Sequence, residues 1–224
     1  MTFENFNIGQ EVIIVKELVS LVEFFLINEN KCNICVSGGS SPLEILKLFS
    51  NAIDFDERIC FFLTDERIVD TRSINSNYNN LILSLGLTNN NIKSMFDNKC
   101  IVSSINDYEL YIKKNLCKKD KALIDILILG FGKDGHIASI FDKESHIEYE
   151  NEYLFSSKNS INGFKRISLK MDLLKTAKNT FLISYGQDKY NLLKNNNDQK
   201  LIVNRYLNGQ KNVKWFYSII DNVY

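Results

Sequence analysis

Apolar residues recur with two different spacings along this 224-residue chain. A return after three or four positions predicts amphipathic helices, and short apolar runs bounded by turn residues predict buried strands. We expect helices at Glu11–Leu26, Pro42–Phe49, Ser76–Leu85, Asp107–Leu116, Met171–Lys178, Asp188–Lys194 and Leu201–Leu207. We expect strands at Lys31–Val36, Ile59–Leu63, Ile92–Met95, Leu123–Leu129, Tyr153–Ser156, Arg166–Leu169, Thr180–Tyr185 and Val213–Ile219.

Strands that alternate with helices favour an α/β fold. The specific expectation is a single open, mostly parallel, twisted sheet with helices on both of its faces. No linker rich in proline or serine and no repeat of fixed period interrupts the alternation. We therefore expect one domain that spans residues 1–224.

Composition narrows the choice of partners. Lysine plus arginine and aspartate plus glutamate each number 27, and no basic stripe stands out, so we expect no nucleic-acid partner and no membrane surface. No apolar run approaches the about 18–20 residues that span a bilayer, and the first ten residues lack a secretory pattern. The five cysteines are odd in number and mostly lie in apolar stretches, which is typical of reduced core thiols in a cytoplasmic protein.

Three loops at the ends of predicted strands carry reactive or anion-binding groups: Ser37–Pro42, Thr64–Asp70 and Gly130–His136. Ligands of open α/β sheets bind outside the carboxyl ends of the strands, near the point where strand order reverses. If the sheet is parallel, all three loops open on one edge and we expect them to converge.

The loop Gly130–His136 is the most informative of the three. It contains G-x-G-x-x-G, but no helix follows directly and the motif lies past the middle of the chain, which argues against a nicotinamide enzyme. It also carries His136, one of two histidines, two residues after Asp134. Imidazole titrates near neutrality, so His136 is a candidate acid/base, and the alternative is a hydrogen-bonded structural histidine.

The other two loops have simple alternatives. Ser37–Pro42 resembles a phosphate cradle because glycines expose backbone N–H groups and a helix N-terminus follows, but a plain strand-to-helix turn has the same residues. The charges of Thr64–Asp70 also fit a solvated loop. With two histidines and no paired cysteine cluster, we expect no catalytic metal.

Several blocks, taken in order, resemble the 6-phosphogluconolactonase family of the glucosamine/galactosamine-6-phosphate isomerase superfamily. The blocks are Ser37–Pro42, Asp65–Arg67, Ser76–Tyr78, Leu129–Phe141, Arg166–Leu169 and Gly186–Lys189. Arg67 after the Asp-Glu pair favours the lactonases over the related deaminases, as does the Ala-Ser-Ile-Phe run after His136. The chain departs from the family at Asp142 and at Ser168, where a proline and a threonine are usual. It also lacks the proline-rich lead into Arg166.

The resemblance implies a Rossmann-like fold, as in sugar-phosphate isomerases, and hydrolysis of a sugar-phosphate lactone, 6-phospho-D-glucono-1,5-lactone, without a cofactor. His136 is the expected general base, and Asp134 or Asp65 would orient it. Backbone N–H groups of Gly38 and Gly39, with Arg67, are candidates for the carbonyl oxygen or the ring hydroxyls. The family's phosphate contacts carry over to Ser40, Ser41, Arg166 and Lys189.

Two alternatives stay open. A deaminase/isomerase would use Asp65 to move a proton between sugar carbons. A non-catalytic sugar-phosphate sensor would bind without turnover, although no helix-turn-helix segment or basic face accompanies the fold here. The expected partner is a small molecule, and the expected state is a monomer or a weak homodimer.

Overall fold

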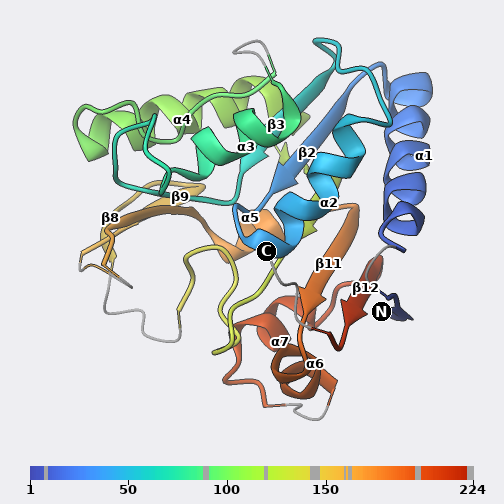
Figure 1. Ribbon diagram of the computed structural model, residues 1–224. Helices are drawn as coiled ribbons and strands as arrows, with labels where there is room; N and C mark the ends of the chain where they lie inside the picture. Colours follow the sequence, from blue (N-terminus) through green and yellow to red (C-terminus); the bar gives the residue numbers. More distant parts are fainter. Residues whose placement is uncertain are drawn as a thin grey trace.

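Figure 1 shows a computed structural model of the protein, which describes residues 1–7, 10–87, 91–118, 121–141, 147–158, 160, 163–194 and 198–220. Its main sheet has six strands in the order β1-β12-β11-β7-β2-β3, and every neighbouring pair is parallel. The strands are β1 (Thr2–Asn5), β2 (Cys32–Val36), β3 (Ile59–Leu63), β7 (Ile126–Leu129), β11 (Asn179–Tyr185) and β12 (Val213–Ser218). The expected α/β class with an open parallel sheet is confirmed.

Helices cover both faces of this sheet. They are α1 (Val12–Glu29), α2 (Ser40–Ser50), α3 (Asn77–Leu85), α4 (Ile101–Leu116), α5 (Met171–Leu174), α6 (Gln187–Lys194) and α7 (Ile202–Leu207). Neighbouring side chains of a strand point to opposite faces. The ring centre of Phe61 in β3 lies 5.3 Å from that of Phe55, which contacts Phe49 of α2. Phe62 points to the other face, where its ring centre lies 5.0 Å from that of Tyr111 in α4. Figure 1 shows α2 and α4 on different sides of the sheet.

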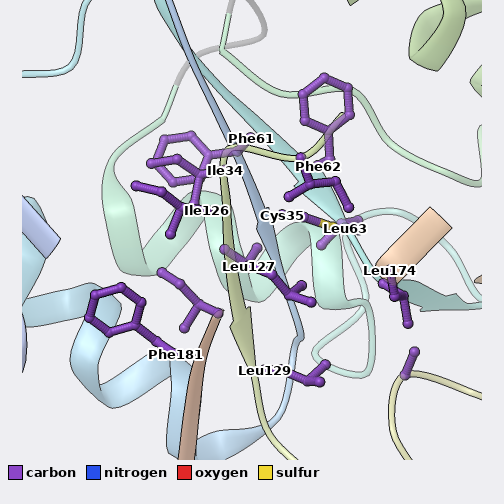
Figure 2. Close-up of a cluster of buried hydrophobic side chains, with 14 of the residues drawn as sticks. Ile34, Cys35, Phe61, Phe62, Leu63, Ile126, Leu127, Leu129, Leu174 and Phe181 are labelled. Atoms are coloured by element: carbon purple, nitrogen blue, oxygen red, sulfur yellow. The ribbon is translucent and has the colours of Figure 1, made fainter. Parts of the chain in front are cut away.

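The centre of the core lies where β2, β3 and β7 run side by side. Every residue of these three strands is buried, which is typical of parallel strands covered on both faces. Figure 2 shows side chains of all three strands meeting there, with Leu174 and Phe181 beside them. Burial raises the pKa of the Cys32 and Cys35 thiols, so both behave as apolar core groups.

A second sheet was not expected from the sequence. It is antiparallel, in the order β4-β10-β9-β8, and consists of β4 (Asp65–Arg67), β10 (Arg166–Leu169), β9 (Leu154–Ser157) and β8 (Ile147–Glu150). Thr64 joins it to the main sheet, because its N–H donates to Val36 O and its carbonyl accepts from Leu169 N. A short ribbon of β5 (Cys117–Lys118) and β6 (Lys121–Ala122) completes the strands of the described residues.

Several predicted boundaries were wrong. Helix α4 begins at Ile101 rather than Asp107, and α5 ends at Leu174 rather than Lys178. The expected strand Ile92–Met95 is reduced to a single bridge between Ile92 and Phe61. Strand β1 was missed altogether. Within the described ranges, no helix is both long and apolar enough to cross a membrane.

Candidate active site

The order of the main sheet reverses between β2 and β7. The chain first moves outward from β2 to β3, and it then returns to the other side of β2 with β7 and continues to β11 and β12. The loops that follow β2 and β7 therefore open at a topological switch point, where ligands of such sheets bind. The Ser37 hydroxyl accepts a hydrogen bond from Gly130 N at 2.9 Å, which ties the two loops together.

A cavity of about 260 Å³ lies at this point. The predicted site residues that line it are Gly38, Gly39, Ser40, Ser41, Asp65, Arg67, His136, Arg166 and Lys189. The remaining predicted residue, Asp134, contacts His136 from beside the cavity. The structure thus brings together residues from the segments that follow β2 and β7, from α6 and from the second sheet. A larger cavity of about 630 Å³ lies at the amino ends of β11 and β12, opposite the carboxyl ends where the first cavity lies. It is lined by Lys16, Thr180 and Val213 among others, and none of the predicted site residues lines it.

His136 is held on two sides. Its Nδ1 lies 2.5 Å from Asp134 Oδ1, and its ring stacks on Phe141 with centroids 4.4 Å apart. Burial pushes the pKa of Asp134 upward, but the hydrogen bond and charge of His136 outweigh burial and hold that pKa below its ordinary value. An ionised carboxylate only accepts hydrogen bonds, so the imidazole proton belongs on Nδ1 and the lone pair on Nε2.

The backbone of the glycine loop is shaped around this imidazole. Gly132 N donates to His136 O, and Gly135 N donates to Gly132 O, at 2.9 and 3.0 Å. Gly135 has φ +81°, which disfavours a side chain. A Cβ at Gly132 would overlap the His136 ring and the Asp134 carboxylate. Glycine at position 132 is therefore a condition for placing this acid/base pair.

The loop after β2 leads directly into a helix. Gly39 is the N-cap residue of α2, with extended backbone, and Ser40 and Ser41 form the first turn. The N–H groups of a first turn have no partner within their helix and carry partial positive charge. A Cβ at Gly38 would overlap the Asn77 side chain, so close packing fixes the loop at this edge of the cavity.

Asp65 and Arg166 pair across β4 and β10, in the buried wall of the cavity. Arg166 Nη1 lies 3.5 Å from Asp65 Oδ2. The same carboxylate accepts hydrogen bonds from the Thr64 hydroxyl at 3.1 Å and the Ser139 hydroxyl at 2.6 Å. Burial lowers the pKa of the Arg166 guanidinium, against the opposing effect of Asp65. The Asp65 carboxylate thus contacts Thr64, Arg166 and Ser139. Asp134 is the carboxylate that contacts His136.

Glu66 and Arg67 differ in role although they are neighbours. Glu66 is buried and accepts from the N–H groups of Asn77 and Tyr78 at 2.8 Å each, and from the Ser76 hydroxyl at 3.0 Å. It therefore caps the N-terminus of α3 rather than lining the cavity. Arg67 donates to Asn75 O, and its guanidinium lies 5.6 Å from the Phe164 ring centre. Among the described residues, its buried Nε has no hydrogen-bond partner.

Sequence reasoning did not single out Asn77 or Ser139 as site residues. Asn77 lines the cavity, and its side-chain amide donates to Asp65 O at 2.9 Å. Both residues lie inside blocks that carried the family resemblance, so the signal was present, but neither type is informative alone. The described residues contain no cluster of three or more histidine, cysteine or acidic side chains arranged to hold a metal.

Comparison with known proteins finds a matching family, related sequences and a similar fold. Residues 13–210 match the family described as Glucosamine-6-phosphate isomerases/6-phosphogluconolactonase. A 6-phosphogluconolactonase of Helicobacter pylori is 30% identical over 198 residues, which cover 84% of this chain and 86% of that protein. The 6-phosphogluconolactonase of Thermotoga maritima is 26% identical over 207 residues, which cover 91% of each chain. A crystal structure of 6-phosphogluconolactonase from the same organism has the same fold. Its TM-score is 0.81 at 24% identity, and the match covers 97% of this chain and 99% of that one.

Proposed function

Because the chain belongs to the glucosamine-6-phosphate isomerase/6-phosphogluconolactonase family, we propose that it hydrolyses 6-phospho-D-glucono-1,5-lactone to 6-phospho-D-gluconate. This reaction is a step of the oxidative pentose phosphate pathway. The observation that carries the proposal is the shared cavity, in which His136 faces the same space as the N-terminus of α2, Arg166 and Lys189. Hydrolysis of a phosphorylated lactone requires a general base and a site that binds the phosphate group.

The reaction begins at the imidazole of His136. With Nδ1 occupied by Asp134, Nε2 removes a proton from a water molecule as that water attacks the lactone carbonyl carbon. The resulting oxyanion is stabilised by the N–H groups of Gly38 and Gly39 together with Arg67. When the oxyanion collapses, the bond to the ring oxygen breaks and that oxygen takes the proton back from His136. The product is the open-chain acid.

The phosphate group is held at the other end of the cavity. Ser40 and Ser41 supply hydroxyls and first-turn N–H groups at the N-terminus of α2, and Arg166 and Lys189 supply positive charge. Lys189 Nζ lies 5.8 Å from the Phe131 ring centre, over the glycine loop. A fixed phosphate keeps the carbonyl carbon near His136, which lowers the entropic part of the barrier.

The test is lactone consumption by the purified protein above the spontaneous background, compared with its His136→Ala variant. Ammonia release from glucosamine-6-phosphate, assayed in parallel, would indicate the deaminase reaction instead. Asp65 is less suited to the proton transfer of that reaction, because its carboxylate is engaged by Thr64, Ser139 and Arg166. Binding of 6-phosphogluconate without turnover of either substrate would indicate a sensor.

The working environment also belongs to this proposal. The five cysteines are free thiols, three of them buried, which fits a reducing cytoplasm. The partner is the small-molecule lactone, and we expect no nucleic acid or membrane partner. A monomer or a weak homodimer is expected, which sedimentation over a range of protein concentrations would test.

A further inference from the structure

Ser139 has no assigned role, yet its hydroxyl connects two charged residues of the cavity wall. The side chain is buried, with 2% of its surface exposed. Its Oγ donates to Asp65 Oδ2 at 2.6 Å and lies 3.4 Å from Arg166 Nη1, which donates to it. One hydroxyl thus serves as donor to the carboxylate and as acceptor for the guanidinium, which few small side chains can do.

The backbone next to Ser139 is held in an uncommon conformation. Ala138 has φ 49°, in the left-handed region that a residue with a Cβ rarely adopts. Ser139 N donates to Ser168 Oγ at 3.2 Å, so both polar groups of this serine are anchored to strands of the second sheet. A strained backbone conformation persists only where surrounding contacts hold it in place. The hydrogen bonds of Ser139 provide such contacts next to Ala138.

The position of Ser139 along the chain gives this contact its meaning. It lies three residues after His136, whereas Asp65 and Arg166 come from β4 and β10. The Ser139 hydroxyl is therefore a direct side-chain link between the segment that carries the base and the strands that carry the guanidinium. Arg166 is also buried, with 7% exposed, so a guanidinium without this acceptor would have few ways to recover the lost hydrogen bond.

We propose that Ser139 is a positioning residue for substrate phosphate, acting through Asp65 and Arg166 without touching the substrate. The proposal rests on the proposed function in one respect, namely that Arg166 binds the phosphate. Removal of the hydroxyl takes one acceptor from the Arg166 guanidinium and one donor from Asp65, so Arg166 is held less firmly and phosphate binding weakens. The geometry of His136 and Asp134 is retained.

The test is a double-mutant cycle between Ser139→Ala and Arg166→Ala, read by calorimetric binding of 6-phosphogluconate. We expect Ser139→Ala to weaken binding about tenfold, the size of one hydrogen bond to a charged group. In the Arg166→Ala background the same change should alter binding less than about twofold, since contacting residues that act together are non-additive. Equal effects in both backgrounds would overturn the proposal.

Steady-state kinetics on two lactones provide a second test. Loss of a serine with only a structural role would not distinguish a phosphorylated substrate from an unphosphorylated one. For the phosphorylated lactone, Ser139→Ala should raise KM by about the same factor as it weakens binding. For glucono-1,5-lactone, which has no phosphate, kcat/KM should stay within about twofold of the unmodified protein. Equal losses on the two lactones would contradict a role through the phosphate.

A matched control removes a buried serine elsewhere. Ser104 of α4 is 3% exposed, and its hydroxyl donates to Asp97 Oδ1 at 2.7 Å, outside the cavity. Ser104→Ala should lower the free energy of unfolding by about as much as Ser139→Ala does, and it should leave binding of 6-phosphogluconate unchanged. Because binding is measured without turnover, absence of lactonase activity would contradict the proposed function while the cycle still decides the role of Ser139.

Discussion

His136 and Asp134 form a hydrogen-bonded pair within a single glycine loop, with Nδ1 and Oδ1 2.5 Å apart. The two residues are separated by Gly135 alone, so the loop that delivers the base also delivers the carboxylate that fixes its tautomer. The Ser37–Gly130 hydrogen bond holds this loop against the one that leads into α2. The Ser37 side chain thereby fixes the loop that carries His136 relative to the N-terminus of α2.

Replacement of His136 by alanine should lower kcat by at least about 100-fold, because a positioned general base typically contributes 10² to 10⁴. Its side chain is 25% exposed, so the fold should survive. The measurements are lactone turnover corrected for the spontaneous reaction, and a thermal unfolding curve. Near-normal turnover by a folded variant would rule out His136 as the base.

Replacement of Asp134 by asparagine should lower kcat about tenfold or more while KM changes little, because the ring loses its orienting charge. The folded pKa of Asp134 is depressed. Its contribution to stability is therefore present above the unfolded value, about 4, and is lost as pH falls through the folded value. Unfolding midpoints compared at pH 3 and pH 7 should show a smaller acid loss in the variant. An unchanged kcat would show that Asp134 does not orient the base.

Replacement of Gly132 by alanine should abolish most activity, because its Cβ would overlap the His136 ring. Gly86 is the matched control. It has φ +63° at the end of α3, and nothing lies within 4 Å of an added Cβ. Gly86→Ala should cost about 1 kcal/mol of stability from backbone strain alone and leave turnover intact. Equal activity of the two variants would contradict the steric argument.

Replacement of Arg166 by alanine should raise KM for the phosphorylated lactone by more than about tenfold, as expected for one charge-assisted contact. Lys189→Ala should act in the same direction. Lys133 provides a control from the same region, since it pairs with Asp188 at 3.4 Å and both side chains are exposed. Lys133→Ala should leave KM unchanged. If Arg166→Ala left KM unchanged as well, Arg166 would not bind the phosphate.

Replacement of Glu66 by alanine should lower the free energy of unfolding by about 3 kcal/mol, since it leaves buried N–H groups unsatisfied at the start of α3. Burial raises the pKa of Glu66 against the lowering effect of these N–H donors. Its contribution to stability is therefore greatest below its unfolded pKa and declines as pH rises through the folded value. Denaturant titrations at pH 4 and pH 8 should show that this decline is absent from the variant.

Glu44, a half-buried carboxylate on α2, is the control for that experiment. Within the part of the chain that the structure describes, its ion pair is a 3.9 Å contact with Lys47. Glu44→Ala should change the free energy of unfolding by less than about 1 kcal/mol at either pH. A Glu66 variant as stable as the Glu44 variant would contradict the capping role.

Periodicity predicted the main sheet well because its strands are short apolar runs. It failed where pairing rather than hydrophobicity makes the strand. Thr2–Asn5 is mostly exposed and polar, and it is a strand because it pairs with β12. Asp65–Arg67 looked like a charged loop, yet it pairs with β10, and those long-range partners are invisible in a local window.

The position of the candidate site could be predicted from the sequence better than the contacts between its residues. Strand ends and glycines placed Ser40, His136 and Arg67 near one another, and the structure brings them to one cavity. The sequence left open whether Asp134 or Asp65 contacts His136, because both lie in loops at strand ends. Only the antiparallel pairing of β4 with β10 shows that Asp65 is turned toward Arg166.

The N–H of Thr64 donates to the main sheet and its carbonyl accepts from the second sheet, so the cavity lies where the two sheets meet. The proton-handling residues belong to the parallel layer, and Arg166 belongs to the antiparallel one. A substitution in β10 is therefore expected to act first on binding of the substrate anion, whereas a substitution in the glycine loop acts first on proton transfer. The two properties can thus change through separate parts of the chain.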